Sequence, residues 1–149
     1  MESRSDAITL RDRLIALHRL REDGKAENRR PRSQRLTDTE RADVLSKTGG
    51  KCHICGGDIR GSWNADHVLA HSAGGRHSAD NYLPAHGTCN HYRWDYLAEE
   101  FELILKLGVW ARTQVERGTA VGRDIETMFS SYEAKRVGRR KNAATSDGV

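Results

Sequence analysis

Residues 51–93 read KCHICGGDIRGSWNADHVLAHSAGGRHSADNYLPAHGTCNHYR, and they hold all three cysteines and six of the seven histidines of the chain. Cys52 and Cys55 are separated by two residues, and His86 and Cys89 repeat that spacing with an imidazole in place of the first thiol. Three thiolates and one imidazole suit tetrahedral zinc, and the glycines beside each pair allow the tight turns that such a site needs. This stretch therefore predicts a structural zinc site.

The cysteines have one other common use, which is a redox pair at Cys52 and Cys55. That motif normally opens a helix after a strand in a βαβ unit, and the sequence shows no such unit here. An odd number of cysteines cannot be fully paired within the chain, and a reducing cytosol favours thiolates that hold a metal over disulfides. The cysteine pattern therefore favours zinc.

Other side chains in this stretch are not needed to close a zinc site. They are Asp66, His67, Gly74, Gly75, Asp80, Asn81, Asn90 and His91. The order Cys-x-x-Cys, Asp-His, Gly-Gly, Asn-x-Leu, ligand-x-x-Cys-Asn and then Arg93 resembles the HNH nuclease family, which has a ββα-metal core. The resemblance covers residues 37–93. It is specific because a lone Cys-x-x-Cys is common, whereas all of these parts rarely occur in order.

The resemblance implies a role for each residue of the motif. His67 becomes the general base, since a neutral imidazole can accept a proton at cellular pH. Asp66 becomes a ligand to a divalent metal, Mg²⁺ or Mn²⁺, which prefers hard oxygen donors. Asn90 takes the position of the second protein ligand, with His91 as the alternative. Asn81 takes the position of the asparagine that orients the loop and the general base.

The expected function is metal-dependent endonuclease cleavage of DNA that leaves 5′-phosphate and 3′-hydroxyl ends. Arg76 and Arg93 are expected to contact phosphates near the site. One active site per chain means that cutting both strands requires a dimer or two encounters, and the sequence carries no reliable dimer signature. A dimer is therefore left open.

Two alternatives to this function remain open. The first is a catalytically inactive, zinc-dependent module that binds nucleic acid, although Asp66, His67 and Asn90 are all present. The second is a nuclease effector acting as a toxin, for which the sequence shows neither a secretion signal nor a further domain. The chain also departs from the family pattern, because His86 replaces the usual cysteine and Ala70 stands where a proline is common.

Composition points to a polyanionic partner. The chain has 149 residues and a formal charge of +4. Of its residues 36% are hydrophobic and 31% are charged, so its apolar core must be small. Basic residues gather in two clusters, namely Lys25, Arg29, Arg30, Arg32 and Arg35, and Lys135, Arg136, Arg139, Arg140 and Lys141. Such clusters fit nucleic acid, because neutralising phosphates releases counterions. Solvated tails are the other interpretation.

No apolar run in the sequence approaches the length of a membrane span, and the N-terminus lacks the apolar core of a signal peptide. We therefore expect a cytoplasmic protein without a membrane partner.

Hydrophobic spacing and capping residues predict the order of the elements. They are a helix over residues 5–22, a basic linker, a helix from Thr37 to Lys47 that starts with a capping box, a strand over 62–69, a loop over 71–79, a return strand from Asn81, a helix from Asn90 through Ala111, and a helix over 124–136. Adjacent side chains on a regular strand point to opposite faces. For Asp66 and His67 to serve one site, the strand must end or distort there.

These elements predict a small α+β protein with a zinc-stapled ββα-metal core, an N-terminal helix and two C-terminal helices. The expected parts are residues 1–36 for the first helix and linker, 37–95 for the nuclease core, 96–141 for the helical extension and 142–149 for a disordered tail.

Overall fold

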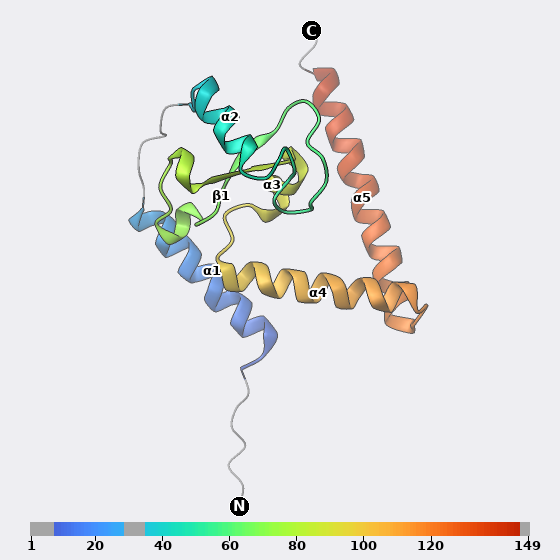
Figure 1. The fold of residues 1–149 in the computed structure, drawn as a ribbon. Helices are drawn as coiled ribbons and strands as arrows, with labels where there is room; N and C mark the ends of the chain where they lie inside the picture. The colour runs from blue at the N-terminus through green and yellow to red at the C-terminus, as the bar shows by residue number, and fades with distance from the viewer. Residues whose placement is uncertain (1–7, 29–34, 147–149) are drawn as a thin grey trace, which may run out of the picture. The chain divides into compact units, whose positions relative to one another are not determined.

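The computed structural model describes residues 8–28 and 35–146 (Figure 1). Two compact units divide the chain, Met1–Phe101 and Glu102–Val149. The elements are α1 (Leu10–Glu27), α2 (Asp38–Ser46), β1 (Asn64–His67), the 3₁₀ helices η1 (His71–Ala73) and η2 (Ala79–Asn81), β2 (Tyr82–Ala85), α3 (Gly87–Arg93), α4 (Ala98–Glu116) and α5 (Ala120–Ser146). The predicted α+β class is confirmed, with a ββα core, an N-terminal helix and two C-terminal helices.

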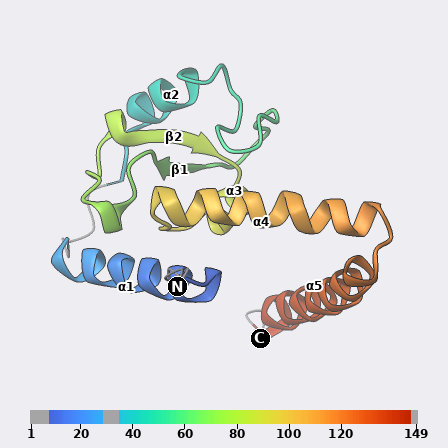
Figure 2. The same cartoon turned by 90° about the horizontal axis from the view of Figure 1, so that it is seen from below.

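A two-stranded antiparallel sheet forms the centre of the first unit. β1 pairs with β2 so that Asp66 lies opposite Leu83 and His67 opposite Tyr82. Helix α2 packs against β2 (Figure 2) and buries Val44 completely. In a sheet of two strands both are edge strands, which is why β2 can accept Pro84, a residue without a backbone N–H.

Helix α2 has the predicted capping box. The Thr37 hydroxyl accepts from the Glu40 amide at 3.3 Å, and the Glu40 carboxylate accepts from the Thr37 amide at 2.8 Å. Gly49 and Gly50 follow the helix with φ of +61° and +77°, values that favour glycine. They turn the chain into the first zinc pair, as the sequence predicts.

Helix α1 lies further along the chain than predicted. It begins at Leu10, because the Thr9 hydroxyl caps it by accepting from the Asp12 amide at 3.1 Å, and it continues past Gly24 to Glu27. Gly24 lies inside the helix and allows α1 to pack closely on η1. A Cβ at position 24 would lie 2.0 Å from the Ser72 carbonyl oxygen. Residues 29–34 of the predicted basic linker lie outside the described residues.

The single helix predicted from Asn90 to Ala111 is wrong, because the structure has two helices there. α3 begins earlier, at Gly87, and ends at Arg93. Trp94 follows with φ of +46°, which breaks the helix. α4 then starts afresh at Ala98, where the Glu100 carboxylate accepts from the Leu97 amide at 3.0 Å.

The second unit consists of most of α4 and all of α5. The two helices approach closely at Gly122, where a Cβ would lie 2.1 Å from the Gln114 carbonyl oxygen. α5 is longer than the predicted 124–136 and continues to Ser146, past the expected start of the tail; 147–149 lie outside the described residues. Among the described helices, none is long and apolar enough to cross a membrane.

Candidate metal centre and active site

The two zinc pairs meet at one point. Cys52, Cys55, His86 and Cys89 each bring one ligand atom to within 4.8 Å of the others. The first pair lies in the turn after α2, and the second lies at the start of α3, so the cluster joins the two ends of the core. Cys55 Sγ lies 3.4 Å and Cys89 Sγ 3.9 Å from His86 Nδ1.

The imidazole of His86 is oriented for a metal by its second ring nitrogen. His86 Nε2 lies 3.1 Å from the carbonyl oxygen of Asp58, to which it can only donate. That hydrogen bond leaves Nδ1 unprotonated and facing the sulfurs, which is how metal-binding histidines are commonly held. The same hydrogen bond and the nearby Cys55 raise the pKa of His86.

The three thiols are too close to ionise together without a cation. Burial acts to raise the pKa of Cys52, but hydrogen bonds from the backbone of Cys55 and His86 lower it to about 6. Burial and the neighbouring sulfurs of Cys55 and Cys52 raise the pKa of Cys89 to about 12. A divalent ion between the sulfurs would remove this repulsion. The donor set therefore fits the predicted structural zinc.

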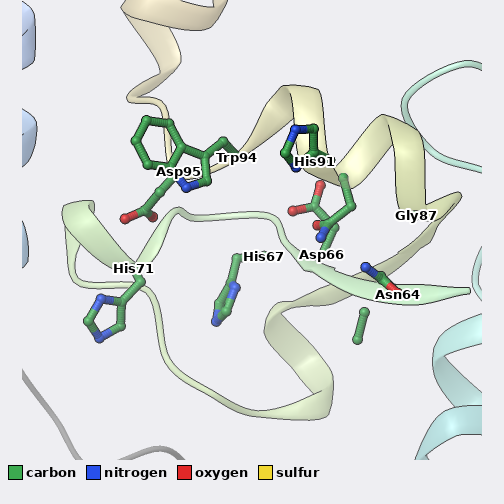
Figure 3. A pocket seen from close by; sticks show the side chains of 10 residues that line it. Asn64, Asp66, His67, His71, Gly87, His91, Trp94 and Asp95 are labelled. Atoms are coloured by element: carbon green, nitrogen blue, oxygen red, sulfur yellow. The ribbon is translucent and has the colours of Figure 1, made fainter. Parts of the chain in front are cut away.

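A cleft with a volume of about 550 Å³ lies between β1, the loop after it and α3 (Figure 3). Its lining residues are Asn64, Ala65, Asp66, His67, His71, Gly87, Asn90, His91, Trp94 and Asp95. β1 ends at His67, so Asp66 and His67 both reach the cleft although they are adjacent in the chain. The structure thus brings four of the predicted site residues together, namely Asp66, His67, Asn90 and His91.

Asp66 is almost fully buried, with 3% of its surface exposed, and two basic side chains approach its carboxylate. Oδ2 lies 2.7 Å from His53 Nε2 and 3.4 Å from Arg93 Nε. Burial raises the pKa of Asp66, while Arg93 and His53 act to lower it. The sequence interpretation left His53 without a role, because nothing in its spacing shows that it reaches Asp66.

His67 is held by two neighbours. Its Nε2 lies 3.0 Å from His77 Nδ1, and its ring packs edge-on against Tyr82 at 4.7 Å between centroids. His77 Nδ1 also lies 3.2 Å from the Tyr82 hydroxyl. Burial, followed by the nearby His77 and His71, lowers the pKa of His67 to about 4. His67 is therefore neutral at physiological pH.

His71 and His77, which have no role in the sequence motif, lie beside the candidate site and are partly buried. His71 lines the cleft, and its ring lies 5.0 Å from that of His77. Among the described side chains, His71 Nε2 is one of two buried polar atoms without a hydrogen-bond partner. The Asp-His pair alone does not reveal these neighbours, but the concentration of histidines in the stretch is a signal that could have.

Asn81 ties down the loop between the strands. Its Oδ1 accepts from the Leu69 amide at 3.0 Å, and its Nδ2 donates to the carbonyls of Leu69 at 3.1 Å and Arg76 at 2.9 Å. Gly75 makes this closure possible, because a Cβ there would lie 1.8 Å from the Leu69 carbonyl oxygen. Asn81 itself does not line the cleft.

The remaining predicted residues differ in exposure. Asn90 lies within α3, and its amide donates to the His86 carbonyl, so it does not stand at the helix start. Arg76 is exposed, whereas the Arg93 side chain is 13% exposed and donates to the Val68 carbonyl at 3.1 Å. Phosphate contacts by either arginine remain predictions.

Comparison with known proteins gives one match. A family model described as HNH endonuclease matches residues 52–93, which span both zinc pairs and the cleft residues between them. No curated protein and no solved structure matches the chain. The matched residues, the ββα core and the Cys₃His cluster agree with one another: residues 52–93 are an HNH endonuclease domain.

Proposed function

We propose that this protein is a metal-dependent endonuclease that hydrolyses phosphodiester bonds of DNA. The observation that carries the proposal is the convergence of Asp66, His67 and Asn90 on one cleft inside the region that matches the HNH family model. Both Asp66 and His67 line the cleft, and Figure 3 shows Asp66 pointing towards the side of α3 that bears His91, whereas the ring of His67 lies on the other side of β1.

His67 acts as the general base. Its lowered pKa keeps the ring neutral, and the contact between its Nε2 and His77 fixes one ring nitrogen, so the other can accept a proton from water. The water oxygen forms a bond to phosphorus as the bond from phosphorus to O3′ breaks. The products are a 5′-phosphate and a 3′-hydroxyl.

Asp66 and Asn90 are the proposed ligands of one Mg²⁺ or Mn²⁺, with His91 as the alternative to Asn90. A carboxylate and an amide oxygen are the hard donors that these ions prefer. When bound, the ion would stabilise negative charge on the phosphate and on the leaving oxygen. The raised pKa of Asp66 is consistent with a carboxylate that a cation would stabilise in its charged form.

Asn81, Arg76 and Arg93 have supporting roles in this proposal. Asn81 holds the loop that bears His71 and His77, through its bonds to Leu69 and Arg76. The exposed Arg76 contacts a backbone phosphate. Arg93 reaches a phosphate only if it moves from its present contacts with Asp66 and Val68.

Cleavage of supercoiled plasmid tests the proposal. The purified protein is incubated with Mg²⁺, with Mn²⁺ and without an added divalent cation, beside the variants His67→Ala and His18→Ala. His18 lies on α1 outside the cleft and is the matched control. We expect metal-dependent nicking that falls about 10²- to 10⁴-fold in His67→Ala and is retained in His18→Ala. Undiminished cutting by His67→Ala would remove His67 from the mechanism.

One observation favours the alternative of a nucleic-acid-binding module without catalysis. The Asp66 carboxylate already has His53 at 2.7 Å and Arg93 at 3.4 Å, so it is neutralised without a metal. This alternative predicts tight, salt-sensitive binding of DNA and no cutting with either cation. The variant Arg93→Leu distinguishes the two functions. In a nuclease, the rate of cutting should depend more strongly on Mg²⁺, because Arg93 no longer neutralises Asp66. In a binding module, only the affinity for DNA should fall.

A further inference from the structure

Trp94 presents an exposed indole at the edge of the cleft. The residue is 54% exposed and lines the cleft together with Asp66, His67 and His91 (Figure 3).

The backbone of Trp94 is held in a conformation that tryptophan rarely adopts. Its φ of +46° and ψ of −139° are typical of glycine, and it is the only non-glycine residue with positive φ in the described parts of the chain. Strain of this kind persists where the surrounding structure enforces it, and it is concentrated at functional sites. The strained turn directs the chain from α3 towards α4 and places the indole at the cleft.

Two cations from α1 lie close to the indole, and the ring of Tyr96 packs edge-on against it at 5.5 Å between centroids. Lys25 Nζ lies 4.3 Å and Arg21 Cζ 4.8 Å from the ring centroid. These residues are four apart, so both reach Trp94 from the same side of the helix. Arg21 is fixed in turn by a buried ion pair with Glu100 at 3.0 Å. These contacts hold the ring in place before any ligand arrives, while 54% of the residue remains exposed to solvent.

We propose that the exposed indole of Trp94 stacks on an unpaired nucleobase next to the cleaved phosphate. The inference rests on the proposed nuclease function and deepens it by naming the substrate class. In a regular duplex both faces of each base are covered by its neighbours, so an indole can stack only on a base that is single-stranded, at an end, or turned out of the helix. Stacking on aromatic side chains tolerates any base, which fits a site without a base-reading side chain.

Binding to labelled oligonucleotides tests the proposal without cleavage. Affinities for a single strand and for the matching duplex are measured by fluorescence anisotropy, without Mg²⁺ or Mn²⁺, for the wild type, Trp94→Gly and Trp110→Ala. Glycine suits the positive φ, so this variant removes the indole while keeping the turn. Trp110, 49% exposed on α4 and absent from the cleft lining, is the matched control.

We expect Trp94→Gly to lose about 5- to 150-fold in affinity for the single strand, the range that corresponds to one base–aromatic stack. Its affinity for the duplex and the binding of Trp110→Ala should stay within about twofold of the wild type. If Trp94→Gly fails to fold, Trp94→Leu serves instead, because it keeps a bulky apolar side chain and removes the aromatic ring, so it should lose the same preference for single strands. Equal losses on single strand and duplex, or no loss on either, would overturn the proposal.

An abasic scan locates the stacked base. A single abasic nucleotide is placed at successive positions of the strand, and the effect on binding is compared between the wild type and Trp94→Gly. At one position, the abasic nucleotide should lower the affinity of the wild type by the same factor as the substitution Trp94→Gly. At that position it should not lower the affinity of Trp94→Gly any further. Independent effects at every position would overturn the stacking site. Since no step requires cutting, a protein that stacks but never cleaves would refute only the nuclease function.

Discussion

At the scale of single residues, the contact between His67 and His77 should determine whether the proposed general base is correctly presented. His77 Nδ1 lies 3.0 Å from His67 Nε2 and 3.2 Å from the Tyr82 hydroxyl, so it links the base to the strand β2. We expect His77→Ala to lower kcat about 10- to 100-fold with little change in KM, because a misplaced base loses its alignment.

The matched variants His77→Asn and His77→Gln separate alignment from simple packing. Asparagine places a polar atom close to the position of Nδ1, whereas glutamine places one close to Nε2. Recovery of kcat in His77→Asn and not in His77→Gln would support hydrogen bonding to His67. Equal activity of the alanine and asparagine variants, measured as initial rates of plasmid nicking, would contradict it.

Sequence spacing identifies the residues of the site better than it identifies their partners. Asp66, His67 and Asn90 stand at fixed positions relative to the zinc pairs, so a linear pattern can find them, and the structure places all three on one cleft. His53 reaches Asp66 and His77 reaches His67 only through the folded path of the loops. Such contacts depend on tertiary geometry that no spacing encodes.

At the scale of elements, the loop between β1 and β2 depends on Gly75. A Cβ at Gly75 would lie 1.8 Å from the Leu69 carbonyl oxygen and 2.9 Å from Asn81 Nδ2. Both are backbone or hydrogen-bonded atoms that cannot simply swing away. We expect Gly75→Ala to lower the free energy of unfolding by about 1–3 kcal/mol in urea titrations, because of overpacking.

Gly87→Ala is the control for this loop, compared for stability alone. Gly87 begins α3, and a Cβ there meets nothing within 4 Å. Alanine in a helix is favoured over glycine, so this variant should be neutral or slightly more stable. A Gly75→Ala protein as stable as Gly87→Ala would show that the loop can adjust.

The start of α2 offers a second prediction at this scale. Thr37→Ala removes the cap and should lower the free energy of unfolding by about 0.5–2 kcal/mol in urea titrations at neutral pH. Hydrogen bonds from Thr37 lower the pKa of Glu40 in the folded state. Such a carboxylate stabilises the fold above its unfolded pKa and loses that effect as the pH falls through the folded pKa. The difference between wild type and Thr37→Ala should therefore narrow in acid.

Capping signals and hydrophobic periodicity predicted the elements unevenly. The Thr37 capping box and the glycines after α2 are local signals, and both were confirmed. The break at Trp94 was missed, because tryptophan carries no turn signal and tertiary contacts impose its positive φ. The end of α1 was missed for a related reason, since Gly24 serves close packing on Ser72 and does not stop the helix.

At the scale of the whole molecule, the apolar core is too small to hold the first unit without help. The buried apolar residues in the described parts of the chain are Leu17, Val44, Cys52, Ala70, Tyr82 and Ala85. One of these is itself a ligand of the Cys₃His cluster, and two are alanines. In small domains a structural metal compensates for such a core, because its binding energy is available only in the folded state.

Zinc removal should therefore unfold the first unit. We expect one zinc per chain by elemental analysis, and loss of the helical circular dichroism of this unit when a strong chelator extracts it. His86→Cys creates the usual four-cysteine set and should retain the metal, whereas Cys89→Ala leaves three ligands and should lower both zinc content and melting temperature. Val137→Ala, which changes an exposed residue of α5, is the control and should alter neither. A chelated protein that keeps its full signal and melting temperature would show that the hairpin and α2 are sufficient, and the Cys₃His cluster would then need another explanation.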